Sequence, residues 1–488
     1  MLISMLIGFF TSRILLNQLG VVDFGVYNVV GSIIVLLGFL NSTLSLSTQR
    51  FINFELGNKN YQRLQKVYSS SIIIHCTLAF IVFILGETVG LWFVNYHMNI
   101  PEERMVAANC VYQFSIFSTM LSFTMIPRTA TIIAHEHMSQ YATIGIIDVF
   151  LRFSVACMLY IIQIDKLIVY ALAMFLVVLV NYLIYYIYCK RKFPECSFIF
   201  SKDKQLYREM LSFSGWNIFS SISIILNGQV VSIVLNIFFG PIVNAARGIS
   251  TQVNGAIGGF VQNFQIAVNP RIIQTFAANE IQTFYRLINQ SAKFSFFLLL
   301  IFVVPVWINI DNILQLWLGT VPEHTADFCR IVFISSLINT FSLPLATAAN
   351  ATGNIKVFQL ACGVFEILNI PLSYLLLKLG NPPVAVYFVQ LTITISTFFV
   401  RLIVLRKLVN LNVSLFLTKI VFRCLFVAVL SFSTMMIVTY INTESMLGLL
   451  SSIFISLSLT ALFIIFGGLN QEEKAIAINL IKNKLHIK

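Results

Sequence analysis

Charged residues are scarce in this sequence. Asp, Glu, Lys and Arg make up 10% of its 488 residues, whereas they make up about a quarter of a typical soluble domain. Hydrophobic residues reach 58% and the mean hydropathy is +0.88. This composition argues against a soluble enzyme, and equally against disorder, which requires low hydrophobicity and high charge. It favours a membrane protein built from apolar segments of about 20 residues each.

Several chemical motifs are also missing. The sequence has no G-x-x-x-x-G-K-[ST] loop and no H-E-x-x-H pair, and its eight cysteines form no C-x-x-C motif. These absences argue against ATP hydrolysis by this chain and against a zinc site. His135 and His137 are interpreted as solvated loop histidines, so neither a metal nor a cofactor is expected. The loops on the outer side are short, which argues against a polysaccharide ligase or polymerase.

The net charge of +12 is distributed as in a membrane protein rather than a nucleic-acid-binding protein. With fourteen spans and both ends inside, 23 of the 31 Lys and Arg residues fall on the inner side and four on the outer side. Cytoplasmic loops of membrane proteins carry such an excess of basic residues. The sequence therefore predicts that both termini are cytoplasmic and that no nucleic acid is bound.

Apolar runs predict an all-α integral membrane protein with about fourteen transmembrane helices. The expected spans are 1–16, 26–48, 67–94, 105–133, 142–163, 167–189, 210–238, 244–267, 287–308, 326–349, 357–379, 384–404, 420–441 and 447–466.

A weak internal repeat divides these spans into two pseudo-symmetric lobes of six helices. Near the start of each half, one span ends with a Leu-Asn motif that is followed by a glycine, Gly20 in the first half and Gly240 in the second. An arginine comes 30 residues after Gly20, and another comes 31 residues after Gly240. The two copies are about 220 residues apart, which is the length of one lobe. The predicted organisation is an N-terminal lobe, a basic cytoplasmic linker, a C-terminal lobe, two additional helices and a cytoplasmic tail, at 1–189, 190–209, 210–404, 405–466 and 467–488.

Charged side chains inside the expected spans are the first candidates for function, because each costs about 2.5–3.5 kcal/mol at the bilayer centre unless it faces water or a partner. Asp148 and Arg152 are spaced i,i+4 and can pair with each other. This pair either carries a coupling ion or holds the lobe together. Glu366 and Glu87 either carry a coupling proton or accept a hydrogen bond. Arg13 and Arg247 have no partner on their own helices, which favours a role in contacting substrate.

Uncharged polar residues concentrate in spans one, two, seven and eight. Buried polar groups in a membrane must face a wet cavity or each other. Span eight alone carries Asn244, Gln252, Asn254 and Gln262. We therefore expect these four spans to line a central hydrated cavity between the lobes, while the alternative is hydrogen bonding between helices in a dry bundle.

Several short motifs resemble the bacterial polysaccharide flippases of the multidrug/oligosaccharidyl-lipid/polysaccharide exporter superfamily. The motifs are spread over nearly the whole chain, at Thr11–Gly20, Asp23–Val30, Ser47–Phe51, Glu55–Gly57, Asn269–Arg271, Leu316–Gly319 and Pro322–Glu323.

The resemblance implies a transporter that moves undecaprenyl-pyrophosphate-linked oligosaccharide across the bacterial cytoplasmic membrane by alternating access. It also implies that arginines on helices one and eight, here Arg13 and Arg247, engage the pyrophosphate. A polymerase and glycosyltransferases of the same pathway are the implied partners. The candidate substrate-binding residues are Arg13, Asn28, Arg247, Gln252 and Asn254.

Two alternatives remain. A cation-coupled multidrug exporter of the same superfamily would be expected to carry unpaired acids in a largely apolar cavity. A membrane-embedded glycosyltransferase or ligase would need a catalytic cluster, and the sequence has none.

Overall fold

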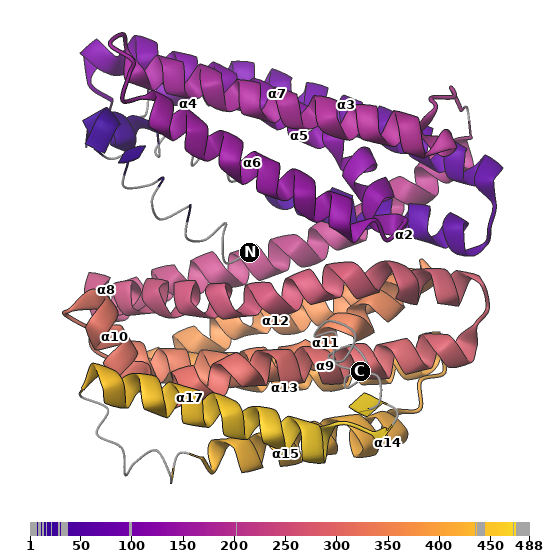
Figure 1. The fold of residues 1–488 in the computed structure, drawn as a ribbon, viewed down its shortest axis with the longest axis vertical. Helices are drawn as coiled ribbons and strands as arrows, with labels where there is room; N and C mark the ends of the chain where they lie inside the picture. Colours follow the sequence, from indigo (N-terminus) through magenta and orange to yellow (C-terminus); the bar gives the residue numbers. More distant parts are fainter. Residues whose placement is uncertain are drawn as a thin grey trace, which may run out of the picture. The chain divides into compact units, whose positions relative to one another are not determined.

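A computed structural model of the chain describes residues 7, 11, 14–15, 17–20, 22–27, 30, 38–96, 100–201, 203–434, 436, 445–471 and 473–474. The chain separates into two compact units, Met1–Ile218 and Phe219–Lys488. Figure 1 shows both units as bundles of long helices. Among the described residues there is no β-strand, so the all-α fold expected from the sequence is confirmed.

The first unit is built around α5, which packs against α2, α3, α6 and α7. Buried aliphatic and aromatic residues hold the bundle together, including Val111 and Tyr112 of α5, which are fully buried. Its elements are α2 (Gly38–Gly57), α3 (Tyr61–Leu85), the π-helix η1 (Gly86–Gly90), α4 (Leu91–Tyr96), the 3₁₀-helix η2 (Glu102–Arg104), α5 (Met105–Ala134), α6 (Met138–Met158), α7 (Lys166–Lys192), the 3₁₀-helix η3 (Pro194–Cys196) and the beginning of α8 (Lys204–Ala277).

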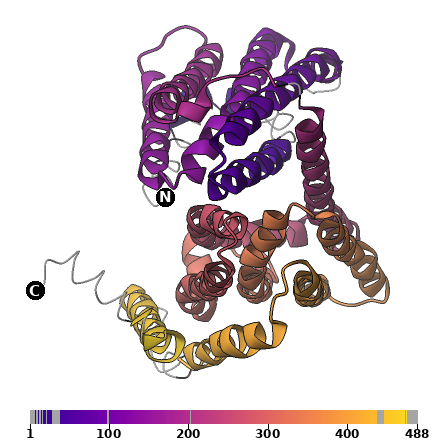
Figure 2. The same cartoon turned by 90° about the vertical axis from the view of Figure 1, so that its right-hand side faces the viewer.

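The second unit contains the rest of α8 and a bundle in which α11 packs against α9 and α13. At its edge, α15 and α17 pack against each other and against α9 (Figures 1 and 2). Its further elements are α9 (Ile281–Ile308), α10 (Ile310–Leu318), α11 (Thr325–Thr352), α12 (Lys356–Lys378), α13 (Val384–Leu408), α14 (Val413–Phe416), the π-helix η4 (Leu417–Val421), α15 (Phe422–Phe432), α17 (Met446–Phe463) and the π-helix η5 (Ile464–Gly468).

Helix α8 is two helices joined at a sharp break. Gly240 has φ 75° and ψ −166°, a backbone conformation that only glycine adopts readily. The two halves pack together through Leu235 and Ala246 in a core shared with Phe328 of α11 and Tyr387 of α13. Gly20, which the internal repeat pairs with Gly240, has a φ of 76°. The two copies of the repeat therefore share a positive φ at equivalent glycines.

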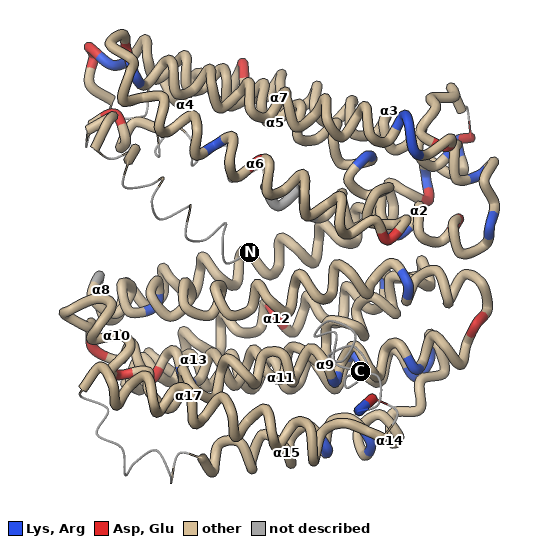
Figure 3. Tube along the Cα trace, in the orientation of Figure 1, with Lys and Arg blue, Asp and Glu red and all other residues tan. Residues whose placement is uncertain are grey.

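Eleven helical segments in the described part of the chain are long and apolar enough to cross a membrane. They coincide with the expected spans three to seven and nine to fourteen. The expected span 244–267 is the second half of α8, which is helical but too polar to be counted among the eleven. Most of the expected span 1–16 and part of 26–48 lie outside the described residues. Figure 3 shows that charged residues gather at the ends of the helices, as membrane insertion requires.

Candidate functional site

From Asn244 onward, the second half of α8 exposes polar and small residues, and the only large apolar residue exposed on the described part of this half is Ile242, beside the break. Gln252, Gly255 and Gln262 are exposed, whereas Ala246 and Val261 on other faces of the helix are buried. Helix α12 of the same unit shows the opposite pattern, because its exposed residues include the apolar side chains Val364, Ile367, Leu368 and Leu372. Lipid tails cannot hydrogen-bond to amides, so the exposed face of the second half of α8 suits water or a hydrophilic ligand.

Arg247 lies on this half of α8 and is half-buried. Its Nη2 atom donates a hydrogen bond of 2.9 Å to the backbone carbonyl of Gly228 in the first half of the helix. Its guanidinium also interacts with the hydroxyl of Tyr387 on α13. Among the described residues no carboxylate lies within ion-pair distance of Arg247. A guanidinium has five N–H donors, so donors remain for an anionic ligand.

The other candidates for substrate binding differ in their surroundings. Gln252 is exposed. Asn254 is half-buried, and its Oδ1 atom accepts a hydrogen bond of 2.8 Å from Ser336 of α11. Asn254 therefore also fastens α8 to α11. Arg13 and Asn28 lie outside the described residues.

Glu366 of α12 belongs to a chain of hydrogen bonds. Its Oε2 atom accepts a hydrogen bond of 3.1 Å from Asn227 of α8. Asn227 accepts a hydrogen bond of 2.7 Å from Asn369, which in turn accepts one of 3.1 Å from Ser373. Asn227 immediately precedes Gly228, the acceptor for Arg247, so the candidate anion-binding arginine and the candidate coupling carboxylate contact adjacent residues of α8.

Asp148 and Arg152 form the ion pair that their spacing predicts, with Arg152 Nε 2.9 Å from Asp148 Oδ2. A third residue joins them, because Asn181 of α7 donates a hydrogen bond of 2.6 Å to Asp148 Oδ1. The sequence carried a signal for Asn181, since it is the one amide within the apolar stretch of α7. Its pairing with Asp148 depends on how α6 and α7 pack.

Glu87 lies in the π-helix η1. Its Oε2 atom accepts a hydrogen bond of 3.0 Å from Gln113 of α5, while Oε1 is buried without a hydrogen-bond partner among the described residues. The Tyr112 hydroxyl donates to the carbonyl of Gly86 at 2.8 Å, and it occupies the space that a Cβ atom at Gly90 would need. The site therefore combines a π-helix, a close backbone approach and an unsatisfied carboxylate oxygen.

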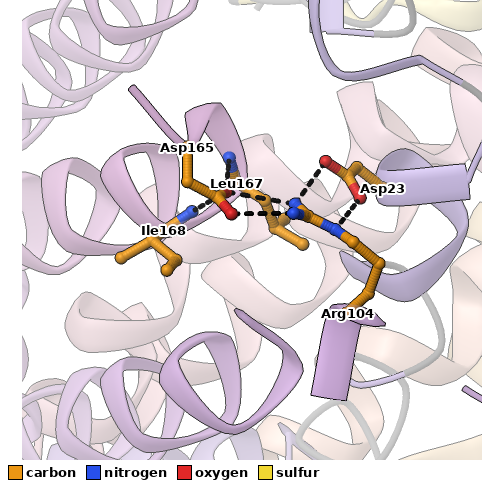
Figure 4. A network of polar contacts seen from close by, with 5 residues as sticks. All are labelled: Asp23, Arg104, Asp165, Leu167 and Ile168. Atoms are coloured by element: carbon orange, nitrogen blue, oxygen red, sulfur yellow. Dashed lines mark hydrogen bonds and ion pairs between the residues drawn. The ribbon is translucent and has the colours of Figure 1, made fainter. Parts of the chain in front are cut away.

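A cluster around Arg104 was not foreseen from the sequence (Figure 4). Arg104 makes two hydrogen bonds of 2.6 Å to Asp23 and bonds of 2.7 and 3.1 Å to Asp165. Asp165 also accepts from the backbone amides of Leu167 and Ile168, so it caps α7. The hydrogen bond from Arg104 is the largest influence on Asp165 and holds the pKa of its carboxyl below the ordinary value. The cluster ties the segment at Asp23 to η2, just before α5, and to the beginning of α7.

The loop histidines are engaged with neighbouring side chains. His135 contacts Glu195, and His137 Nδ1 lies 2.8 Å from the Tyr188 hydroxyl. Within the described ranges, no group of three or more His, Cys, Asp or Glu residues is arranged to hold a metal ion.

The chain is similar to two families of proteins. A model of the family described as polysaccharide biosynthesis protein matches residues 1–276, and a model of the family MatE matches residues 217–375. No curated protein matches the chain significantly.

Solved transporters share its fold. The outward-facing conformation of a multidrug resistance MATE family transporter of the MOP superfamily matches with a TM-score of 0.72 and 13% identity, over 84% of this chain and 94% of that chain. A MOP superfamily transporter from Pyrococcus furiosus matches with a TM-score of 0.71 and 12% identity, over 85% of this chain and 94% of that chain. The description of that structure reports a reverse polarity of its binding pocket and suggests a different function for that transporter.

Proposed function

The chain belongs to the polysaccharide biosynthesis protein family and is a multi-pass transporter of the MOP superfamily, and on this premise we propose that it is a flippase for lipid-linked oligosaccharides. The cargo is an undecaprenyl-pyrophosphate-linked repeat unit used to build a surface polysaccharide. The transporter carries it from the cytoplasmic to the outer leaflet of a bacterial cytoplasmic membrane, with both ends of the chain in the cytoplasm. Glycosyltransferases that assemble the unit and a polymerase that consumes it are the proposed partners.

The observation that carries this proposal is the exposed face of the second half of α8. Its amides, such as Gln252, are suited to hydrogen-bonding with sugar hydroxyls. Arg247 on the same half-helix supplies a guanidinium with no carboxylate partner among the described residues, and a guanidinium binds phosphate oxygens in a bidentate manner. An anionic head joined to a sugar chain requires both kinds of contact.

Energy coupling is proposed to run through Asp148. A proton or sodium ion competes with Arg152 for the carboxylate, so the carboxylate is held either by Arg152 or by the ion. The hydrogen bond from Asn181 of α7 orients the Asp148 carboxylate while it is paired with Arg152. The membrane potential supplies about 2.3 kcal/mol per charge per 100 mV, which is enough to bias such a two-state switch. Glu366 and Glu87 are the further candidates for carrying the ion.

A cation-coupled multidrug exporter is the second candidate function. It is favoured by the match of the MatE family model to residues 217–375, a range that contains Glu366. This carboxylate is half-buried, and among the described residues no basic side chain forms an ion pair with it. In an exporter of organic cations, such a group would bind the drug or its coupling ion.

The two functions can be separated in proteoliposomes that contain the purified protein. One assay follows movement of an undecaprenyl-pyrophosphate-linked oligosaccharide between leaflets, and the other follows uptake of a fluorescent organic cation. We expect Arg247→Ala to slow lipid flipping by about tenfold or more, because a lost charge-assisted hydrogen bond is worth about 1.5–3 kcal/mol. Arg247→Lys should restore part of the rate, since lysine keeps the charge but not the fork of donors.

Arg406→Ala is the matched control, because Arg406 is an exposed arginine of the same unit for which no ion pair or side-chain hydrogen bond is found among the described residues. If the Arg247→Ala variant flips the lipid at the wild-type rate, Arg247 is not the residue that binds the anionic head of the substrate. Transport of the organic cation that depends on Glu366, together with no flipping of the lipid, would favour the multidrug exporter instead.

A further inference from the structure

A basic pocket lies in the second unit, on other elements than the residues considered so far. It has a volume of about 830 Å³, within the range of about 300–1,000 Å³ that is typical of small-molecule sites. Its wall follows α9 from Gln282 to Lys293, a separation that corresponds to about 16 Å of helix. The span Val413–Phe432 and the segment after η5 complete it. The pocket therefore lies where membrane-spanning helices begin and end.

The lining carries positive charge that is not neutralised by its own residues. Four basic residues line the pocket, Arg286, Lys293, Lys419 and Arg423, against the single acidic residue Glu473. Glu473 is fully engaged in an ion pair with Lys293, and the side chains of this pair are 7% and 2% exposed. Arg286 and Lys419 are exposed and have no ion-pair partner in the described part of the chain.

Hydrogen bonding identifies which groups are committed and which are available. Arg423 donates to the carbonyls of Gly467 and Leu469 at 2.9 and 3.1 Å and contacts the Asn470 side chain, so it holds the wall together. Arg286 and Lys419, by contrast, are exposed and make no ion pair among the described residues, so their charges are available to a ligand. A ligand that fits the pocket must supply negative charge to Arg286 and Lys419.

The backbone around the pocket contains two π-helices, an irregularity that favours a ligand-binding site. Lys419 lies in the π-helix η4, and the carbonyl that receives Arg423 belongs to the π-helix η5. Such π-helices are rare and occur frequently at functional sites. At Gly468 of η5, a Cβ atom would lie 2.6 Å from the ring of Phe297 on α9. Only glycine at this position lets η5 approach α9 closely enough to close the wall.

We propose that this pocket binds a phosphate-bearing anion, as in the headgroup of the anionic lipid phosphatidylglycerol. Guanidinium and ammonium groups bind phosphate oxygens through charge-assisted hydrogen bonds. A soluble phosphate shares the anionic part of this chemistry. The site goes beyond the proposed flippase activity and does not depend on it.

The test measures binding to the purified full-length protein in zwitterionic detergent by native mass spectrometry. The ligands are phosphatidylglycerol, inorganic pyrophosphate and, as a neutral lipid, phosphatidylcholine. The pocket variant is Arg286→Gln combined with Lys419→Gln. The control variant is Lys204→Gln combined with Arg208→Gln, which removes one lysine and one arginine that are exposed on α8 outside the pocket.

We expect the pocket variant to bind phosphatidylglycerol about tenfold more weakly, which corresponds to about 1.4 kcal/mol, and the control variant to bind it as the wild type does. The single variants Arg286→Gln and Lys419→Gln should each lose part of this affinity, and they replace the double variant if it does not fold. Pyrophosphate binding that depends on the pocket, without binding of the lipid, assigns the phosphate to a soluble source. Equal losses in pocket and control variants, binding of phosphatidylcholine as tight as that of phosphatidylglycerol, or no binding of either phosphate ligand would overturn the proposal.

Discussion

Replacing Gly240 by alanine tests whether the break in α8 depends on backbone conformation alone. A Cβ atom added at Gly240 would meet nothing within 4 Å, so the substitution creates no steric clash with neighbouring residues. Its cost is therefore the strain of placing an L-residue at φ 75° and ψ −166°, which amounts to about 1–3 kcal/mol. The strain would act on the turn that brings Arg247 against the Gly228 carbonyl.

Gly215→Ala is the matched control, because Gly215 also lies in α8 and also has nothing within 4 Å of an added Cβ atom, but its φ is not positive. Alanine stabilises a helix by about 0.5–1 kcal/mol relative to glycine. The two variants should therefore differ by about 1.5–4 kcal/mol in the free energy of unfolding, with opposite signs relative to the wild type. Equilibrium unfolding of the purified protein in mixed micelles, followed by circular dichroism, measures the difference. Equal changes in stability would refute the argument from Gly240.

Four further predictions concern the first unit and the orientation of the chain. Replacing Arg104 by glutamine should lower the free energy of unfolding by about 1.5–3 kcal/mol, since it removes charge-assisted hydrogen bonds to two carboxylates, and thermal unfolding will show whether it does. For Asp165→Asn, the deficit in stability should be largest above the ordinary carboxyl pKa of about 4. This deficit should vanish as the pH falls through the lowered pKa of Asp165. A deficit that stays the same at every pH would contradict a stabilising role for the charge of Asp165. Asp148→Asn should slow flipping and weaken its dependence on an imposed pH or sodium gradient, whereas wild-type transport that ignores both gradients would return Asp148 to a structural role. Reporter fusions at Lys488 and within 190–209 should both report the cytoplasm, and a signal from the other side at either position would contradict the fourteen-span topology.

The sequence by itself was sufficient for the class of fold. Hydropathy located the eleven spans that the described part of the chain bears out, because each transmembrane helix must satisfy its own backbone hydrogen bonds and present an apolar surface over a fixed length. It also located contacts between near neighbours on one helix, such as Asp148 with Arg152, since the helical repeat places residues i and i+4 side by side. The exposed polar face of α8 follows from the same periodicity once the helix is recognised in spite of its low hydropathy.

Contacts between distant residues were decided only by the tertiary structure. Nothing in the local sequence pairs Arg104 with Asp23, Asn181 with Asp148 or Lys293 with Glu473, because each contact depends on which faces of two helices meet and at what height. The contact of Arg247 with Gly228 likewise depends on the turn at Gly240, which brings the two halves of α8 together. Its contact with Tyr387 depends on the packing of α8 against α13, and the contact of Glu366 with Asn227 depends on the packing of α8 against α12. Helix periodicity is a local property that can be read along the chain, whereas the register between helices is set by the simultaneous packing of all their side chains.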